Sequence, residues 1–393
     1  FPFKRGLCGS GRNAPKISRL YKRGLESNKS FSNCILILNI RVIKVEAPAR
    51  ICFFGDHQDY LNLPVIAGTI NRFIHIEGKP INKKSFFLEL IDIKEVITID
   101  LNKKYNNIKN GDYFLSALDI LKRAGFLFNQ GYKIKIFGEI PINAGISSSS
   151  ALVVAWIRFL ISIQDHKTEI TDLQIGRWAY EAESEFFNQP GGLMDQYTIS
   201  QKGLLYIDTK TTQTERLNPD IGNLVIAESG IAKKTLSILQ NARAYAEASI
   251  NAVKKKVPDF DIFKADEADY DEYLAFVPEI YRDHWYATIF NHILTQKARK
   301  MLKLGPLDLE QLGAWMDSHQ KILQEKIQNT PKKMELQMQA ARKAGALGTK
   351  IIGSGGGGCM VAIVSEKSKE NVIKAFLNNG AKAAYEINLT TPI

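Results

Sequence analysis

A serine-rich loop precedes an apolar, helix-forming stretch and could bind a phosphate chain. Residues 141–150 read Pro-Ile-Asn-Ala-Gly-Ile-Ser-Ser-Ser-Ser, and the apolar stretch covers 151–163. The first turn of a helix has backbone N–H groups without intrahelical partners, and the helix dipole adds positive potential there. Glycine lets a phosphate approach the backbone, and serine hydroxyls can donate to it or bind its metal ion. A simple helix cap is the alternative, but a cap needs one serine rather than four. The pattern therefore favours a triphosphate-binding loop.

A second group of polar side chains follows an apolar, strand-like segment over 49–54. Gly55 ends that segment, and Asp56, His57, Asp59 and Tyr60 come directly after it. A strand end is a rigid platform, and carboxylates there can accept hydrogen bonds from the hydroxyls of a small polyol. A metal site is an alternative, because His and Asp are ligand types. A plain polar turn is the third interpretation.

Two further carboxylates suit phosphoryl transfer. Asp195 follows a Pro-Gly-Gly turn at 190–192, and Glu183 lies on the helical segment before it. Two carboxylates, a serine loop and a separate glycine loop are the parts that magnesium-dependent phosphoryl transfer needs. The chain contains no Gly-x-x-x-x-Gly-Lys-Ser/Thr sequence and no protein-kinase His-Arg-Asp or Asp-Phe-Gly set, which excludes P-loop enzymes and protein kinases.

The glycine loop covers 353–358, with five glycines in six residues. It formally contains Gly-x-Gly-x-x-Gly, but a dinucleotide site needs a helix after the glycines, and 359–364 is typical of a strand. The loop therefore fits close backbone approach to a ligand or to another loop, with a flexible hairpin as the alternative.

These four segments, in this order, resemble the motifs of the GHMP kinase superfamily, which includes galactokinases, homoserine kinases and mevalonate kinases. Residues 48–60 are similar to the galactokinase sugar signature. Residues 141–151 resemble the Pro-x-x-x-Gly-Leu/Ile-Ser-Ser-Ser loop of the superfamily, and 192–196 resemble the galactokinase Gly-Ile/Leu-Met-Asp-Gln motif. Residues 353–359 resemble the third, glycine-rich motif, so the similarity covers about residues 44–393.

The resemblance implies an α+β, two-domain GHMP kinase fold. Its N-terminal domain would be like domain 2 of ribosomal protein S5, and its helix-rich C-terminal domain would be ferredoxin-like. The implied reaction transfers the γ-phosphate of ATP, with Mg²⁺, to the anomeric hydroxyl of a galactose-like monosaccharide. Two alternatives stay open: a GHMP kinase for another small alcohol, such as a heptose phosphate, a uronic acid or mevalonate, or a catalytically silent relative that senses sugars.

The resemblance also implies a role for each motif residue. Asp195 would be the catalytic base or orienting carboxylate, and Arg50 would lie beside it, hold it ionised and stabilise the transferred phosphoryl group. Ser149 and Glu183 would hold Mg²⁺. The residues implied to bind the nucleotide are Pro141, Asn143, Ala144, Gly145, Ile146, Ser147, Ser148, Ser149 and Ser150. Those implied to bind the sugar are Asp56, His57, Asp59, Tyr60, Gly192, Gly355 and Gly356.

Three departures from the galactokinase pattern lie beside the implied sugar site. Asp56 stands where galactokinases usually have Glu, and Gln58 stands where they have Thr. Leu-Asn-Leu at 61–63 replaces their Asn-x-Gly. A shorter acid and a missing turn glycine leave the identity of the sugar more open than the chemistry.

The elements that must position these residues form a β-rich first half and a helix-rich second half. Strands are predicted over 42–46, 49–54, 65–70, 73–77, 86–91, 95–101 and 132–137, with helices over 111–124, 151–163 and 172–187. Farther along, strands are predicted over 204–207, 224–228, 349–352, 359–364 and 383–389. Helices are predicted there over 235–253, 286–304, 309–327, 332–344 and 371–378. The predicted domains are 44–212 and 213–393, after a basic, disordered extension over 1–43.

Composition indicates a soluble globular protein, and it does not indicate a nucleic-acid or membrane partner. The 393 residues carry a formal net charge of +11, but residues 1–44 hold ten Lys/Arg and one acid, so the remainder is nearly neutral. No apolar run approaches the ~20 residues that span a bilayer. The four cysteines are dispersed, without Cys-x-x-Cys spacing, so a reducing cytoplasm is expected. We expect a monomer or homodimer whose partners are ATP and a sugar.

Overall fold

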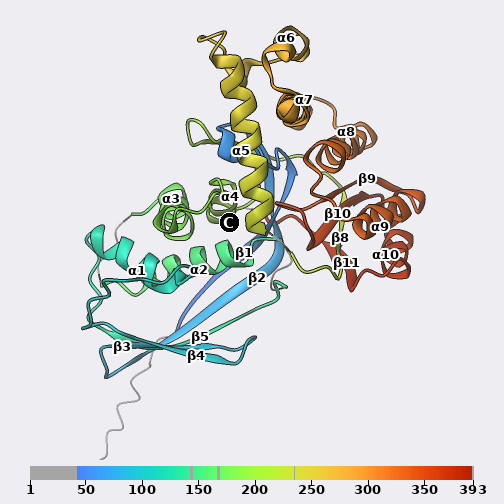
Figure 1. Cartoon of the computed structure of the whole chain (residues 1–393). Coiled ribbons are helices and arrows are strands. Elements are labelled where there is room, and N and C mark those ends of the chain that lie inside the picture. Colours follow the sequence, from blue (N-terminus) through green and yellow to red (C-terminus); the bar gives the residue numbers. More distant parts are fainter. Residues whose placement is uncertain (1–41, 142–144, 166–168, 234, 392–393) are drawn as a thin grey trace, which may run out of the picture. The chain divides into compact units, whose positions relative to one another are not determined.

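The computed structural model describes residues 42–141, 145–165, 169–233 and 235–391 (Figure 1). The predicted extension over 1–43 lies outside these residues, except for its last two.

The first sheet carries two long antiparallel strands at its centre. β1 (Ile43–Phe54) pairs with β2 (Val65–Ile81), and β2 belongs to the strand order β4-β3-β5-β2-β6-β7. The other strands are β3 (Ser85–Leu90), β4 (Glu95–Asp100), β5 (Gly131–Gly138), β6 (Leu204–Asp208) and β7 (Gln213–Leu217). The sequence predicted two strands within each of β1 and β2. They are continuous because a shift of register between Pro48 and Ala49 accommodates the proline within the pair.

Four helices cover one face of this sheet (Figure 1). They are α1 (Tyr113–Arg123), α2 (Ser148–Ser162), α3 (Asp172–Glu183) and α4 (Met194–Gln201). α2 is apolar on nearly all sides because it lies between the sheet and α1, α3 and α4, and both Trp156 and Phe159 are fully buried. α4 was not predicted, because its eight residues show no apolar periodicity.

A second, antiparallel sheet follows in the order β11-β8-β10-β9. Its strands are β8 (Asn223–Glu228), β9 (Ala346–Ile351), β10 (Cys359–Val364) and β11 (Ala383–Ile387). Helices α9 (Lys332–Lys343) and α10 (Lys369–Asn378) pack on it. This order, with two helical crossovers, is that of a ferredoxin-like domain. The predicted α+β fold with a ferredoxin-like C-terminal domain is confirmed.

The remaining helices lie between β8 and β9 in the sequence. They are α5 (Thr235–Lys254), α6 (Glu267–Tyr273), α7 (Arg282–Leu304) and α8 (Leu309–Ile322), which continues as a π-helical turn at Leu323–Ile327. Short 3₁₀ turns occur at Asp59–Leu61, Glu185–Phe187, Ile262–Lys264, Leu274–Phe276 and Glu279–Tyr281. Within the described residues, no helix combines the length and the apolar character needed to cross a bilayer.

The predicted domain boundary between 212 and 213 falls in the turn that joins β6 to β7. β7 still pairs with β6 in the first sheet, and the described residues belong to one compact unit. The limits 44–212 and 213–393 stay a prediction.

Candidate active site

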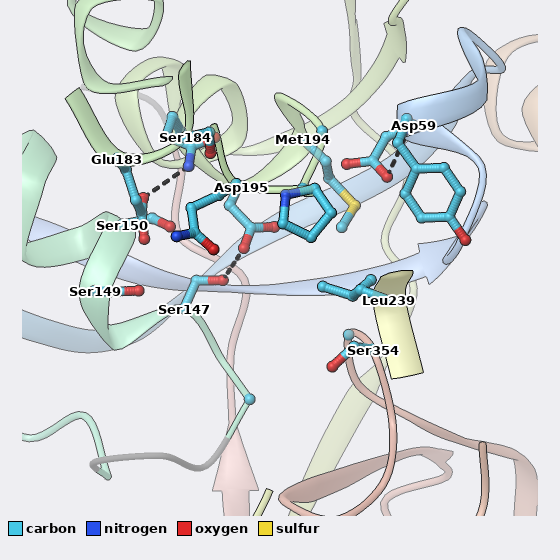
Figure 2. Close-up of a pocket in the computed structure, with 18 of the residues that line it drawn as sticks. Asp59, Ser147, Ser149, Ser150, Glu183, Ser184, Met194, Asp195, Leu239 and Ser354 are labelled. Atoms are coloured by element: carbon cyan, nitrogen blue, oxygen red, sulfur yellow. Dashed lines mark hydrogen bonds between the residues drawn. The ribbon is translucent and has the colours of Figure 1, made fainter. Parts of the chain in front are cut away.

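One cavity of about 280 Å³ gathers residues from most of the predicted motifs. Its lining comes from the end of β1 and the turn after it, the serine loop, α3 and α4, the start of α5, and the loop between β9 and β10. Figure 2 shows Ser147 pointing toward Asp195, with Ser149 and Glu183 on one side of Asp195 and Asp59 on the other. Segments up to about 300 residues apart therefore meet around one aspartate.

Asp195 is held by two donors from different elements. The Arg50 guanidinium, on β1, donates from Nε to Oδ1 at 2.6 Å and from Nη2 to Oδ2 at 2.8 Å. This is the bidentate geometry that fits a carboxylate. The hydroxyl of Ser147 also donates to Oδ2 of Asp195. The predicted proximity of Arg50 and Asp195 is thus present, and Asp195 has a fixed orientation at the start of α4.

Electrostatics keep Asp195 ionised. Burial alone would raise its pKa, but the charge of Arg50 and the hydrogen bonds from Arg50 and Ser147 lower the pKa below its usual value. The same pair raises the pKa of Arg50 against the opposing effect of burial. A carboxylate with a lowered pKa is a weak base, so Asp195 is better suited to orienting a ligand and contributing negative charge than to removing a proton.

The serine loop is attached to β1 and does not serve as a simple helix cap. The backbone N–H of Arg50 donates to the carbonyl of Ile146 at 3.3 Å, and Nη1 of Arg50 donates to the carbonyl of Gly145 at 3.1 Å. Ser147 is the N-cap residue of α2, yet its side chain makes no capping bond and its φ is 60°. Its hydroxyl is used at Asp195 instead. The cap interpretation therefore does not account for Ser147.

Glu183 and the serines of the first turn of α2 converge on the same side of the cavity. Gln196 Nε2 donates to the buried Glu183 carboxylate at 2.7 Å, and Ser149 and Ser150 lie near enough to it to lower its pKa. Burial nevertheless raises the pKa of Glu183. The predicted magnesium donors, Ser149 and Glu183, therefore line the same side of the cavity. A hydroxyl oxygen and a carboxylate oxygen are donors that suit a hard cation, which would complete its coordination with water or other oxygen ligands.

Asp56 lies in the cavity wall, but its carboxylate is already engaged. Oδ2 pairs with the Lys350 ammonium at 2.5 Å, and Oδ1 accepts from the Gly353 N–H at 3.0 Å. Burial would raise the pKa of Asp56, but the charge of Lys350 and its hydrogen bond lower it. Since Asp56 joins the end of β1 to β9 and to the glycine loop, its contacts are those of a positioning residue.

His57 and Tyr60 also bind within the protein. His57 Nε2 donates to the Ser354 carbonyl at 3.0 Å, so Nδ1 is the acceptor for the Tyr60 hydroxyl at 2.9 Å. Burial lowers the pKa of His57 to about 4, which makes the ring neutral near pH 7. The ring therefore presents a neutral edge to the cavity and supports the loop that carries Ser354.

Asp59 is the carboxylate of this turn that remains for a ligand. Oδ1 accepts from the Tyr60 N–H at 3.0 Å. Burial and the charge of Asp195 raise the pKa of Asp59 to about 7. Gly192 packs directly on it, because a Cβ at Gly192 would lie 2.3 Å from Cγ of Asp59. The predicted sugar-site residues Asp59 and Gly192 thus form one surface beside Asp195.

The glycine loop contributes its first residues to the cavity and its later ones to packing. All five of its glycines have positive φ, from 73° to 140°, which explains the composition. Gly353 and Ser354 line the cavity. In contrast to the sequence prediction, Gly355 and Gly356 lie against Asn329: the Gly356 N–H donates to its carbonyl at 2.6 Å, and a Cβ at Gly355 would lie 2.5 Å from that oxygen.

Only some of the serine-loop residues predicted to bind the nucleotide line the cavity. Gly145 and the four serines line the cavity, whereas Pro141 does not, and Ile146 is fully buried in the hydrophobic core. Asn143 and Ala144 lie outside the described residues.

Sequence reasoning missed several cavity residues. Lys233, Leu239 and Tyr113 line the cavity, and Lys350 supports it through Asp56. Lys350 sits between glycines and apolar residues on a buried strand, and a lysine there signals a buried partner. Lys233 stands at the end of an irregular segment before α5 and had no distinguishing pattern.

Family models match both halves of the chain. The model described as "GHMP kinases N terminal domain" matches residues 112–203, and "GHMP kinases C terminal" matches 299–382. The first match contains the serine loop, Glu183 and Asp195.

Similar proteins are known from several organisms. A galactokinase of Thermococcus kodakarensis is 26% identical over 337 residues, covering 84% of this chain and 91% of its own length. A galactokinase of Streptococcus thermophilus is 27% identical and covers 84% and 87%. Among solved structures, Lactococcus lactis galactokinase complexed with galactose shares the fold with a TM-score of 0.77, 20% identity and coverage of 90% and 94%. Methanococcus jannaschii mevalonate kinase shares it with a TM-score of 0.67, 21% identity and coverage of 89% and 99%. With both domain models and these relatives, the chain carries the N- and C-terminal domains of the GHMP kinases and is galactokinase-like.

Proposed function

We propose that this protein is a sugar kinase that transfers the γ-phosphate of ATP to the anomeric hydroxyl of galactose or a galactose-like monosaccharide. The galactokinase relatives support this choice of substrate. We further propose that it acts in the cytoplasm as a monomer or homodimer.

The observation that carries the proposal is the position of Asp195 between two dissimilar surfaces. On one side lie the serine loop and Glu183, which suit a phosphate chain and its metal ion. On the other side lie Asp59 and Gly192, which suit a hydroxyl-bearing ligand. A phosphate donor and a sugar acceptor bound there would meet at Asp195, as in-line transfer requires.

In the proposed step, the anomeric oxygen of the sugar attacks the γ-phosphorus of ATP. The bond from that phosphorus to the β–γ bridging oxygen breaks, and ADP leaves with the electron pair. The hydroxyl proton passes to the Asp195 carboxylate. Because Arg50 holds the pKa of Asp195 below its usual value, orientation of the hydroxyl contributes more than early proton removal.

Ser149 and Glu183 would hold Mg²⁺ on the phosphate side. When bound, the ion would neutralise charge on the phosphate oxygens. The chain's own contribution would be to orient the Glu183 carboxylate, through the hydrogen bond from Gln196, beside Ser149 and Ser150.

The test is ADP release by purified protein over a panel of free sugars with ATP and Mg²⁺. Galactose and its epimers form the panel, with mevalonate as a non-sugar alcohol. We expect turnover with galactose or a close relative, and a loss of about 10²-fold or more in kcat for Asp195→Asn, which keeps the shape but removes the charge. Turnover with mevalonate alone, or unchanged turnover in Asp195→Asn, would overturn the proposal.

A further inference from the structure

Lys233 places its ammonium group between the serine loop and the glycine loop. Its Nζ lies 3.3 Å from the point where a Cβ of residue 145 would stand, and 3.2 Å from the corresponding point at residue 353. Both residues are glycine, and a Cβ at either position would crowd the ammonium. Lys233 also lines the cavity that contains Asp195.

A second cation lies beside this ammonium. Nη2 of Arg50 is 3.6 Å from the same Cβ point of Gly353. The two cations repel each other, but the charge of Arg50 is already matched by its bidentate pair with Asp195. Among the residues that the structure describes, Lys233 forms no ion pair within 4.0 Å. Lys233 therefore adds a positive charge to the cavity, and this charge is not paired with a carboxylate of the described residues.

The surroundings of Lys233 fit an anion with several charges. Burial, then the charge of Arg50, lowers the pKa of Lys233 to about 8. Holding an ammonium in such a place is unfavourable without a counter-ion, and a phosphate chain on the neighbouring serine loop would provide it. A neutral sugar would not.

We propose that Lys233 is a catalytic residue that binds the γ-phosphoryl group of ATP opposite Asp195. This inference rests on the proposed function. In the transfer step, the sugar oxygen forms its bond to the γ-phosphorus while the bond to the bridging oxygen of ADP breaks. Lys233 donates hydrogen bonds to a non-bridging oxygen of the group in transit, so it stabilises the transition state without gaining or losing a proton.

Variants at position 233 separate charge from structure. Lys233→Met keeps the length of the side chain and removes the charge, and Lys233→Arg restores a cation. Lys254→Met removes an exposed lysine at the last turn of α5 and serves as the control. We expect kcat to fall about 10²- to 10³-fold in Lys233→Met. In Lys233→Arg, kcat should be at least tenfold higher than in Lys233→Met. In Lys254→Met, kcat should stay unchanged. The KM for the sugar should change less than threefold in all three.

A binding measurement tests the same contact without any sugar. Calorimetric titration with AMP-PNP and with ADP, each with Mg²⁺, compares nucleotides that differ at the γ-position. We expect Lys233→Met to lose at least tenfold in affinity for AMP-PNP and less than threefold for ADP. Equal losses for both nucleotides, or none, would overturn the proposal. If the wild-type protein phosphorylates no sugar, the proposed function fails, and this titration still decides the role of Lys233.

The pH profile provides a readout that a purely structural role would not move. The charged or titratable groups facing Lys233 are Arg50 on β1, Asp195 on α4, Asp56 after β1 and Cys359 on β10. The pKa of Cys359 is raised to about 12 and those of both aspartates are lowered, so none of them titrates near pH 8. We expect kcat/KM to fall above about pH 8 in the wild type. In Lys233→Arg, this fall should begin at a higher pH. A limb that stays in place would contradict the proposal.

Discussion

The buried ion pair between Asp56 and Lys350 makes a sharp prediction about stability. Both side chains are almost fully buried, at 1% and 0% exposure. Besides the pair at 2.5 Å, the Lys350 ammonium donates to the carbonyls of Ile351 at 2.8 Å and Cys52 at 3.2 Å. Lys350→Met is close to isosteric, so it removes this charge and these bonds with little change in volume.

The expected cost follows from what the substitution leaves behind. Asp56 would keep the Gly353 N–H as a hydrogen-bond donor but lose its cation, while its side chain is only 1% exposed. Breaking a buried pair by removing one partner costs about 3–5 kcal/mol. The double variant Asp56→Asn/Lys350→Met removes the stranded charge while an amide oxygen can still accept from Gly353. We expect it to recover about half of that loss or more.

The direction of the Asp56 pKa shift determines how the stability contributed by the ion pair changes with pH. The folded-state pKa of Asp56 is lowered, so the pair contributes stability that is present above the unfolded-state pKa and is lost as pH falls through the folded-state pKa. In Lys350→Met, burial without the cation would raise the pKa of Asp56. The carboxyl would then take up a proton at mildly acidic pH, and the deficit relative to wild type should be smaller at pH 5 than at pH 7.

Urea unfolding followed by circular dichroism, at both pH values, measures these differences. Lys374→Met, at an exposed position of α10, is the matched control and should change the free energy of unfolding by less than about 0.5 kcal/mol. A cost below about 1 kcal/mol for Lys350→Met, or a double variant as unstable as the single one, would refute the reasoning.

Three further predictions concern the cavity. Gly192→Ala should displace Asp59, because the added Cβ would lie 2.3 Å from its Cγ, and should raise the sugar KM at least tenfold. Gly191→Ala, with its nearest contact at 4.0 Å, is the control. Equal effects of the two variants on the sugar KM would contradict the packing of Gly192 on Asp59. Ser147→Ala removes one donor to Asp195, and steady-state kinetics should show kcat about tenfold lower with the ATP KM within threefold, whereas an intact kcat would make that hydrogen bond dispensable. Since the pKa of Asp59 is about 7, its carboxylate forms as pH rises through 7, and sugar affinity should increase over pH 6–8; a flat profile, or one unchanged in Asp59→Asn, would exclude Asp59 as the acceptor for a sugar hydroxyl.

The sequence predicted the fold well where apolar residues formed a continuous run. Apolar stretches such as 151–163 and 359–364 became α2 and β10. It failed for α4, which is short and lacks periodicity and is held by packing on α3 and β1. The alternative interpretation of the serine loop as a helix cap fails for a physical reason. Ser147 adopts a left-handed backbone conformation that turns its hydroxyl toward Asp195 instead of the helix end.

The site was predictable as a set of motifs but not as a set of contacts. Residue type and order indicated Arg50 and Asp195, and the structure joins them directly. Asp56 and His57 were read as free polar groups at a strand end. Their partners, Lys350 and the Ser354 carbonyl, lie about 300 residues away and carry no local signal that could be matched to them. Long-range partners of this kind are fixed by the tertiary fold alone.

The central claim is that phosphate passes directly from ATP to the anomeric hydroxyl of a sugar at Asp195. The most direct measurement is the ³¹P spectrum of a reaction of wild-type protein with galactose, ATP and Mg²⁺. The claim predicts that the γ-phosphate signal decreases while a sugar phosphomonoester signal, coupled to the anomeric proton, grows in equal amount, and that Asp195→Asn suppresses both changes. Free inorganic phosphate as the sole product, a phosphoester at another hydroxyl, or an equally active Asp195→Asn variant would contradict it.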